Sequence, residues 1–322
     1  MSDSSIWVIA LLALAILYVA TVGFFVTGGL IVALFLARGD PPDEAQALAF
    51  EAARHPWRRR VLGQTVEILV AAFDLALRAL YFVHLLPKPR DPGSGTPILM
   101  LPGYTENAGA LWWFARKLAN RGFRPVLVDF PSTFHRIDSN VAYLAGLIDT
   151  LRKESGYDKI AVVAHSMGGV IARTHMLTKE DHGILTLVAI ASPFRGTHLA
   201  RLGAAFRLGH SAVDMCPGSA FACRFPPTAA ASAPIHSIVG CQENIVSPVW
   251  SCVLPGCDTF VLSLPVGHDA PLHLHESYER VEAWLVQDGV VRAEAEDSDT
   301  ALDRARDHTA HHLQHDDYGD RG

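Results

Sequence analysis

The segment KIAVVAHSMGGVIAR, residues 159–173, decides the fold of this chain. A strand-like apolar run ends at Ser166, and helical periodicity begins directly after it. This order predicts a nucleophile elbow, a tight turn that holds the Ser166 hydroxyl above a sheet, with Gly168 and Gly169 letting strand and helix approach closely. Ala164 replaces the first glycine of the G-x-S-x-G pattern. An ordinary strand-to-helix turn therefore stays open as the alternative until partners for Ser166 are found.

An earlier strand-like run, residues 97–101, leads into a turn at Pro102 and Gly103. Acyl transfer needs fixed hydrogen-bond donors where negative charge develops, and one such donor is typically worth about 2.7–4 kcal/mol of barrier lowering. We assign these donors to the backbone N–H groups of Tyr104 and Met167, which would form an oxyanion hole. The alternative is a plain loop after a strand.

Two later strand-like runs each end near a residue suited to assist Ser166. Residues 235–240 lead to Glu243, and residues 259–264 lead to His268. The order serine, acid, histidine is that of α/β-hydrolases. We predict that His268 is the general base and that Glu243 orients its imidazole and stabilises the imidazolium. Three other carboxylates, less well placed relative to the strands, remain alternatives for the acid: Asp214, Asp258 and Asp269.

Five segments, in this order, resemble the bacterial triacylglycerol lipase and esterase group of the α/β-hydrolase superfamily. They are LPGYTEN (101–107), VVAHSMGGVIAR (162–173), LVAIASPFRGTHLA (187–200), SIVGCQENIVSP (237–248) and VGHDAPL (266–272). The resemblance covers roughly residues 97–286 and implies the α/β-hydrolase fold and cleavage of carboxylic esters. That group has an Asp at the acid position, where this chain has Glu243; either carboxylate can serve.

The rest of this region alternates between helix-like and strand-like segments, which predicts an α/β fold: a mainly parallel sheet with helices on both faces. Helical spacing is found at 107–120, 138–154 and 272–286, and strand-like runs at 125–130 and 185–191. We expect one catalytic domain over residues 97–290. Within it, residues 195–234 are rich in proline, alanine and short apolar pieces, which indicates either a cap over the site or a disordered insertion.

Composition narrows the choice of partners. The chain is 50% hydrophobic, carries a net charge of −6 and has no basic run interleaved with aromatics, which argues against nucleic-acid binding. The five cysteines include no CxxC pair, so we predict no zinc site, and either disulfides or reduced thiols fit their clustering. The predicted chemistry requires no cofactor and no metal. Protein partners are left open.

The N-terminus predicts a membrane anchor over residues 1–40. Residues 6–37 contain no charged side chain and exceed the roughly 20 residues that cross a bilayer. No basic region precedes them, which distinguishes them from a secretory signal. Arginines follow the anchor, so the positive-inside rule places the next segment in the cytoplasm, and we expect a location at the bacterial inner membrane.

Residues 41–96 are predicted to be a basic linker followed by a second helix. Within this stretch, residues 61–86 are apolar, but Glu67, Asp74 and Arg78 fall on one helical face. Such a helix packs on the domain, lies on the membrane or spans it, and spanning would export the catalytic domain.

After residue 290 the chain is acidic, polar and rich in histidine, which predicts a disordered tail over residues 291–322. Taken together, these features predict a membrane-anchored serine hydrolase acting on carboxylic esters. A lipid or other long-chain ester is the expected substrate, because an anchor holds the site where such molecules concentrate. The alternatives are an acyltransferase or thioesterase with the same triad, and a non-catalytic hydrolase-like membrane protein.

Overall fold

A six-stranded sheet forms the centre of the computed structural model, which describes residues 3–36 and 55–293. The strand order is β2-β1-β3-β4-β5-β6, and all neighbouring strands are parallel. The strands are β1 (Pro97–Leu101), β2 (Arg124–Leu127), β3 (Ile160–His165), β4 (Ile184–Ile190), β5 (Ile235–Val239) and β6 (Asp258–Val261). The parallel sheet predicted from the alternation of elements is therefore confirmed.

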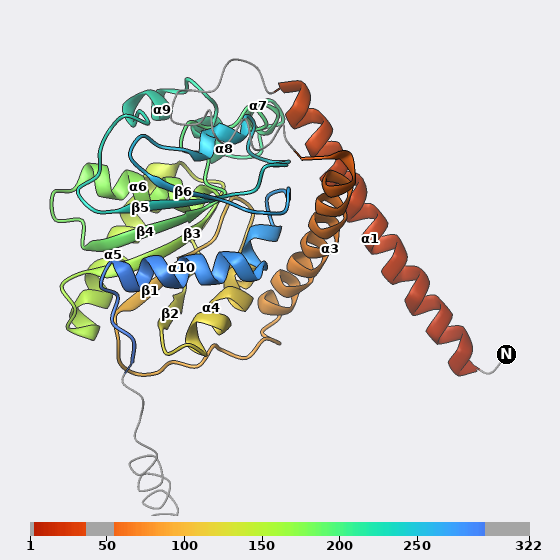
Figure 1. The fold of residues 1–322 in the computed structure, drawn as a ribbon, viewed down its shortest axis with the longest axis horizontal. Coiled ribbons are helices and arrows are strands. Elements are labelled where there is room, and N and C mark those ends of the chain that lie inside the picture. The colour runs from red at the N-terminus through yellow and green to blue at the C-terminus, as the bar shows by residue number, and fades with distance from the viewer. Residues whose placement is uncertain (1–2, 37–54, 294–322) are drawn as a thin grey trace, which may run out of the picture.

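Helices cover both faces of the sheet (Figure 1). One face carries α4 (Trp112–Ala119), which continues the 3-10 turn η2 (Ala108–Leu111), and α10 (His275–Gln287); the other carries α5 (Ile137–Ser155) and α6 (Met167–Thr178). Because the central strands β1, β3 and β4 are buried on both sides, they are apolar at nearly every position, whereas the edge strands β2 and β6 are only partly buried.

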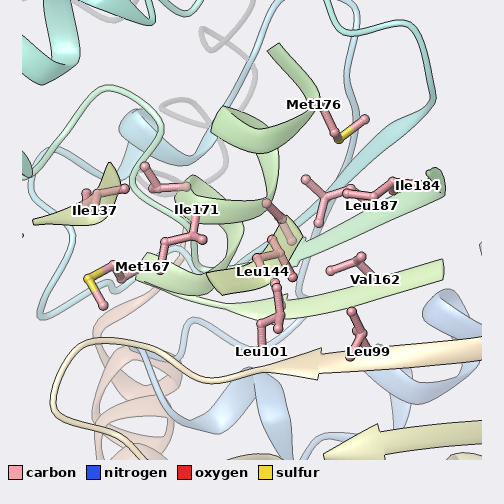
Figure 2. Close-up of a cluster of buried hydrophobic side chains, with 14 of the residues drawn as sticks. Leu99, Leu101, Ile137, Leu144, Val162, Met167, Ile171, Met176, Ile184 and Leu187 are labelled. Atoms are coloured by element: carbon pink, nitrogen blue, oxygen red, sulfur yellow. The ribbon is translucent and has the colours of Figure 1, made fainter. Parts of the chain in front are cut away.

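The alternation of side chains along β1 shows how the two cores are divided. Ile98 and Met100 join the core beneath α4 and α10, whereas Leu99 and Leu101 join the core beneath α5 and α6. Figure 2 shows the second core, in which Leu101 and Val162 of the sheet lie with Met167 of α6. Met167 immediately follows Ser166, so packing of this core fixes the start of α6.

Residues 195–234 form three short helices between β4 and β5: α7 (Ala200–Ala205), α8 (His210–Asp214) and α9 (Ala220–Arg224). They lie together above the sheet in the view of Figure 1. The Tyr104 hydroxyl donates a hydrogen bond to the carbonyl of Leu208, and the N–H of His210 donates to the carbonyl of Phe134. The segment therefore contacts the loops that follow β1 and β2.

Two long helices precede the sheet, α1 (Asp3–Leu36) and α3 (Trp57–Phe82), and lie side by side (Figure 1). They run antiparallel, since the Tyr18 hydroxyl donates to the carbonyl of Ala72 (2.7 Å) while Gln64 donates to the hydroxyl of Thr27 (3.4 Å). Among the described helices, the segment Leu14–Phe35 of α1 is the one long and apolar enough to cross a membrane, a criterion that signal sequences also meet.

The element boundaries near the C-terminus differ from the sequence prediction. β6 ends at Val261, and the 3-10 turn η4 (Ala270–Leu272) precedes α10. The N–H of Ser263 donates to the Glu276 carboxylate instead of to β5, and Pro265 has no N–H to donate, so the chain leaves the sheet earlier than expected. Pro271 starts the turn η4. No disulfide joins the five cysteines, all of which are described. The predicted tail lies outside the described residues from residue 294 on, and so does the predicted basic linker from residue 41 to residue 54.

Candidate active site

Ser166 sits at the turn between β3 and α6 in a backbone conformation that few residues adopt, with φ 50° and ψ −123°. Such a conformation costs about 1–3 kcal/mol and persists only where the surroundings enforce it. Two glycines allow the close packing: a Cβ on Gly103 would lie 2.8 Å from Ser166 Cβ, and one on Gly168 would lie 2.7 Å from the carbonyl oxygen of Leu101. The strand-to-helix turn expected from the sequence is present, with Ser166 at its apex.

The structure brings Glu243 and His268 together, although they follow different strands. The Glu243 carboxylate lies 3.0 and 3.1 Å from Nδ1 of His268. Its Oε1 also accepts hydrogen bonds from the N–H groups of Ile245 (2.9 Å) and Val246 (3.1 Å), which fix its orientation. The rings of His268 and His165 are 4.6 Å apart, so His268 lies beside the residue that precedes Ser166.

Each member of this pair shifts the pKa of the other. Burial alone would raise the pKa of Glu243, but the charge of His268 and the hydrogen bonds to the carboxylate lower it. Burial alone would lower the pKa of His268, but the carboxylate of Glu243 raises it to about 9. Because Nδ1 faces the carboxylate, Nε2 is the ring atom left to exchange a proton with another group.

The three alternative acids have other contacts. Asp258 accepts a hydrogen bond from Trp284 Nε1 (2.8 Å), and Asp214 accepts one from the N–H of Ile137 (3.0 Å). Asp269 lies within 4.8 Å of the side chains of Glu106 and His165. Within the described ranges, Glu243 is the carboxylate hydrogen-bonded to the His268 ring.

Glu106 and His165 form a buried ion pair beneath the site. Nδ1 of His165 lies 3.0 Å from both Glu106 oxygens, and its Nε2 lies 3.1 Å from the carbonyl oxygen of His268. Both ring nitrogens therefore face acceptors, which requires a doubly protonated imidazolium. Burial opposes this charge, but the Glu106 carboxylate raises the pKa of His165. Together with Asp269 these residues form a possible metal-ligand group, but an imidazolium has no lone pair to offer.

The two residues expected to form the oxyanion hole lie on adjoining elements. Met167 is the first residue of α6, where N–H groups have no partner within the helix. Tyr104 follows Gly103, whose own N–H donates to Glu106 (2.6 Å) and so fixes the loop. In the part of the chain that the structure describes, neither the Met167 N–H nor the Tyr104 N–H donates a hydrogen bond.

The loop that carries His268 has contacts that the sequence did not predict. The N–H of His268 donates to Asn244 Oδ1 (2.8 Å). The N–H groups of Gly267, Asp269 and Ala270 donate to the carboxylate of Glu67 in α3. The only sequence signal was the charged face of residues 61–86. That face turns toward the domain, since Glu67 and Asp74 are both buried.

A cavity of about 510 Å³ lies between α1, α3 and the loop that carries Glu243. Its lining is mostly apolar and includes Leu30, Ala33, Val61, Val246, Val249 and Trp250, with Arg60 and Gln64 among its polar groups. The volume falls within the range of about 300–1,000 Å³ that is typical of ligand pockets.

Comparison with known proteins supports this architecture. Residues 96–210 match the sequence family described as alpha/beta hydrolase fold. Cutinase est1 of Thermobifida alba is 28% identical over 89 residues, which cover 25% of this chain and 30% of the cutinase. A bis(hydroxyethyl) terephthalate hydrolase of Streptomyces coelicolor is 26% identical over 140 residues, 41% of each protein. The chain therefore spans less than half the length of these curated relatives.

Solved structures show the same fold at low sequence identity. Aspergillus fumigatus lipase B superimposes with a TM-score of 0.55 at 14% identity, covering 84% of this chain and 86% of that one. Mature Bacillus licheniformis lipase BlEst2 gives 0.50 at 15% identity, covering 63% and 96%. This chain has the α/β-hydrolase fold, and its resemblance to lipases and esterases of that fold is confirmed.

Proposed function

We propose that this protein is a membrane-anchored serine hydrolase that cleaves carboxylic esters with Ser166, His268 and Glu243 as its catalytic triad. The observation that carries the proposal is the hydrogen bond between Glu243 and His268 Nδ1, formed next to the strained turn that holds Ser166. A carboxylate in this position selects the imidazole tautomer whose Nε2 can accept a proton.

The reaction proceeds through an acyl-enzyme. Ser166 Oγ attacks the ester carbonyl while Nε2 of His268 takes the hydroxyl proton, and Glu243 stabilises the resulting imidazolium. His268 then returns the proton to the departing alcohol, which leaves the acyl group on Ser166. Water repeats the two steps and releases the acid.

Negative charge on the substrate oxygen is stabilised by the N–H groups of Met167 and Tyr104. Their lack of other acceptors within the described residues supports this role. Donors fixed in advance are effective because they do not reorganise as the charge develops. The packing of Gly168 against the backbone of Leu101 and Pro102, and of Gly103 against the side chains of Ser166 and Glu106, supports the fixed placement of these donors.

We further propose a lipid or other long-chain ester as the substrate. The exposed side of α1 carries large apolar side chains, including Phe24 (74% exposed) and Phe35 (77%), that suit a bilayer. The segment at 195–234 also exposes Phe206 (74%) and Leu208, as expected of a cap that meets apolar substrates.

A fluorophosphonate probe followed by a series of p-nitrophenyl esters of increasing chain length tests this proposal. We expect labelling of the wild type, no labelling of Ser166→Ala, and kcat/KM that increases with acyl length. A wild-type protein that is neither labelled nor active would overturn the hydrolase assignment. A preference for acetate over longer acyl groups would overturn the lipid assignment alone.

A further inference from the structure

We propose that Glu67 of α3 is a positioning residue for His268, which makes α3 a working part of the active site. This inference rests on the proposed function, because it takes His268 as the general base. It extends the catalytic machinery to a helix that precedes the family-matched residues 96–210.

The contacts of Glu67 surround the His268 backbone. Its Oε2 accepts hydrogen bonds from the N–H groups of Gly267 (3.0 Å) and Ala270 (3.1 Å), and its Oε1 accepts one from Asp269 (2.9 Å). The N–H of His268 itself is held by Asn244. Four consecutive N–H groups are thus each bound by a side chain, three of them by one carboxylate.

The loop approaches Glu67 and Asn244 so closely that position 267 requires a glycine. A Cβ on Gly267 would lie 2.7 Å from Glu67 Cδ and 2.3 Å from Asn244 Oδ1. The loop therefore has little freedom between α3 and the loop that carries the acid. A shift of either α3 or the loop that carries Glu243 would move the His268 ring relative to Ser166 and Glu243.

A carboxylate suits this position better than any other side chain. It only accepts hydrogen bonds and offers two oxygens, whereas an amide offers one oxygen and an NH2 group that would meet the loop N–H groups donor to donor. Glu67 is fully buried, and burial, together with the nearby carboxylates of Asp269 and Glu243, raises its pKa to about 8, whereas the hydrogen bonds from the loop lower it. An apolar residue would dock α3 without the cost of burying a carboxyl group, so Glu67 indicates a role in holding the loop.

The second half of α3 contacts the other side of the site. The Arg78 guanidinium donates to the carbonyl of Thr105, and Asn107 Nδ2 donates to the carbonyl of Arg78 (3.0 Å). These residues border Tyr104, one of the proposed oxyanion donors. A single helix therefore contacts both the His268 loop and the oxyanion loop.

Two substitutions, Glu67→Gln and Glu67→Asp, test the role of Glu67, with Leu77→Ala as the control. Leu77 is buried in α3, so its truncation weakens packing of the helix without removing an acceptor from the loop. Each full-length variant is titrated with the fluorophosphonate probe, and kcat and KM for a short soluble ester are expressed per labelled site. This normalisation separates misfolded protein from folded protein that turns over slowly.

We expect Glu67→Gln to lower kcat by about tenfold to a hundredfold with little change in KM, because a small misplacement of a catalytic group carries such a cost. Glu67→Asp should restore part of the loss, since it keeps the carboxylate. Leu77→Ala should lower the melting temperature and leave kcat per labelled site within about twofold of wild type. Equal kcat in Glu67→Gln and Leu77→Ala would overturn the proposal.

The pH profile supplies a readout that a purely structural role would not change. The charged and titratable groups facing His268 and its loop are Glu243, Asp269, Glu106, His165 and Glu67, whose pKa is raised by burial to about 8. A loosened loop weakens the Glu243–His268 contact, so the acid limb of kcat/KM in Glu67→Gln should move to lower pH. An unmoved limb together with wild-type kcat would assign Glu67 a purely structural role.

Gly267→Ala disturbs the same loop without changing Glu67, because its Cβ would meet Asn244 Oδ1 and Glu67 Cδ, so its kcat alone serves as the test where Glu67 variants do not fold, and the double variant serves where they do. It should lower kcat like Glu67→Gln, and the double variant should lose little more than the worse single variant, as expected for residues acting through one contact. A fully additive loss would contradict the inference. Failure of the proposed function has a different signature, because the wild type would then be neither labelled nor active, or Ser166→Ala would keep the activity, whatever the Glu67 variants do.

Discussion

The edge of the sheet at which the carboxyl ends of its strands lie, called the edge below, contains buried charged groups, whereas helix α1 contains almost none. At the edge, Glu243, Glu106 and Glu67 are buried carboxylates, and each accepts several hydrogen bonds. α1 has no charged residue after Asp3 and exposes large apolar side chains along one side. The edge is therefore fixed by specific partners, whereas α1 matches any apolar surroundings, including lipid.

This difference teaches where substitutions should act. A buried carboxylate left without its partner costs more than the loss of one contact, so changes at the edge should alter the chemical step itself. α3 belongs with the edge, since its charged face is buried on the catalytic loops. Changes on the exposed side of α1 should matter only when the substrate is itself in a membrane; its other side contacts the loop that carries Glu243, where the Ser247 hydroxyl donates to the carbonyl of Ala33 (2.7 Å).

The largest effect is expected for Ser166→Ala, which removes the nucleophile at the edge. Triad members act as a unit, so kcat should fall by a factor of order 10⁶, as in well-studied serine proteases. Turnover of a purified soluble ester measures the loss, and circular dichroism checks that the fold persists. Near wild-type turnover would end the serine hydrolase assignment.

Glu243→Gln should lower kcat by about three to four orders of magnitude, because an amide no longer selects the reactive imidazole tautomer. Asp258→Asn is the matched control, since Asp258 contacts Trp284 at the far end of β5 and β6. Steady-state kinetics of both variants decide which carboxylate is the acid of the triad. A mild Glu243→Gln and a severe Asp258→Asn would move the acid to Asp258.

Deletion of residues 1–40 tests whether α1 brings the active site to a substrate in the membrane. Hydrolysis of an ester embedded in vesicles should fall by about a hundredfold or more, because tethering supplies effective concentration, whereas hydrolysis of a short soluble ester should persist. The ratio of the two rates in deleted and full-length protein is the measurement. Equal retention of both activities would contradict the lipid substrate.

The pH dependence of kcat/KM should reveal the electrostatics of the edge without any substitution. The general base must be neutral, and Glu243 raises the pKa of His268 to about 9, so the rate should fall tenfold for each pH unit below that value and level off above it. Rates from pH 5 to 10 on a soluble ester test this expectation. A kcat/KM that already levels off near pH 6.5 would show that Glu243 does not raise the pKa of His268.

Local sequence patterns were sufficient for much of the fold. The run that ends at Ser166 predicted β3, the turn and α6, because an apolar strand, small residues and helical spacing are encoded within fifteen neighbours. The order of Ser166, Glu243 and His268 also followed from the positions at which strand-like runs end. In a parallel sheet all these ends meet at one edge, so the sequence placed the three residues near one another without any long-range information.

Only the tertiary structure decided which side chains pair at that edge. The sequence left Glu243, Asp258, Asp214 and Asp269 open as the acid, and the structure brings Glu243 to the His268 ring. It left residues 61–86 free to pack, lie on a membrane or span it, and the structure docks this helix through Glu67 onto a loop 200 residues away. Periodicity reports which face of a helix is polar, but the partner of a buried charge depends on chain segments that meet only after folding.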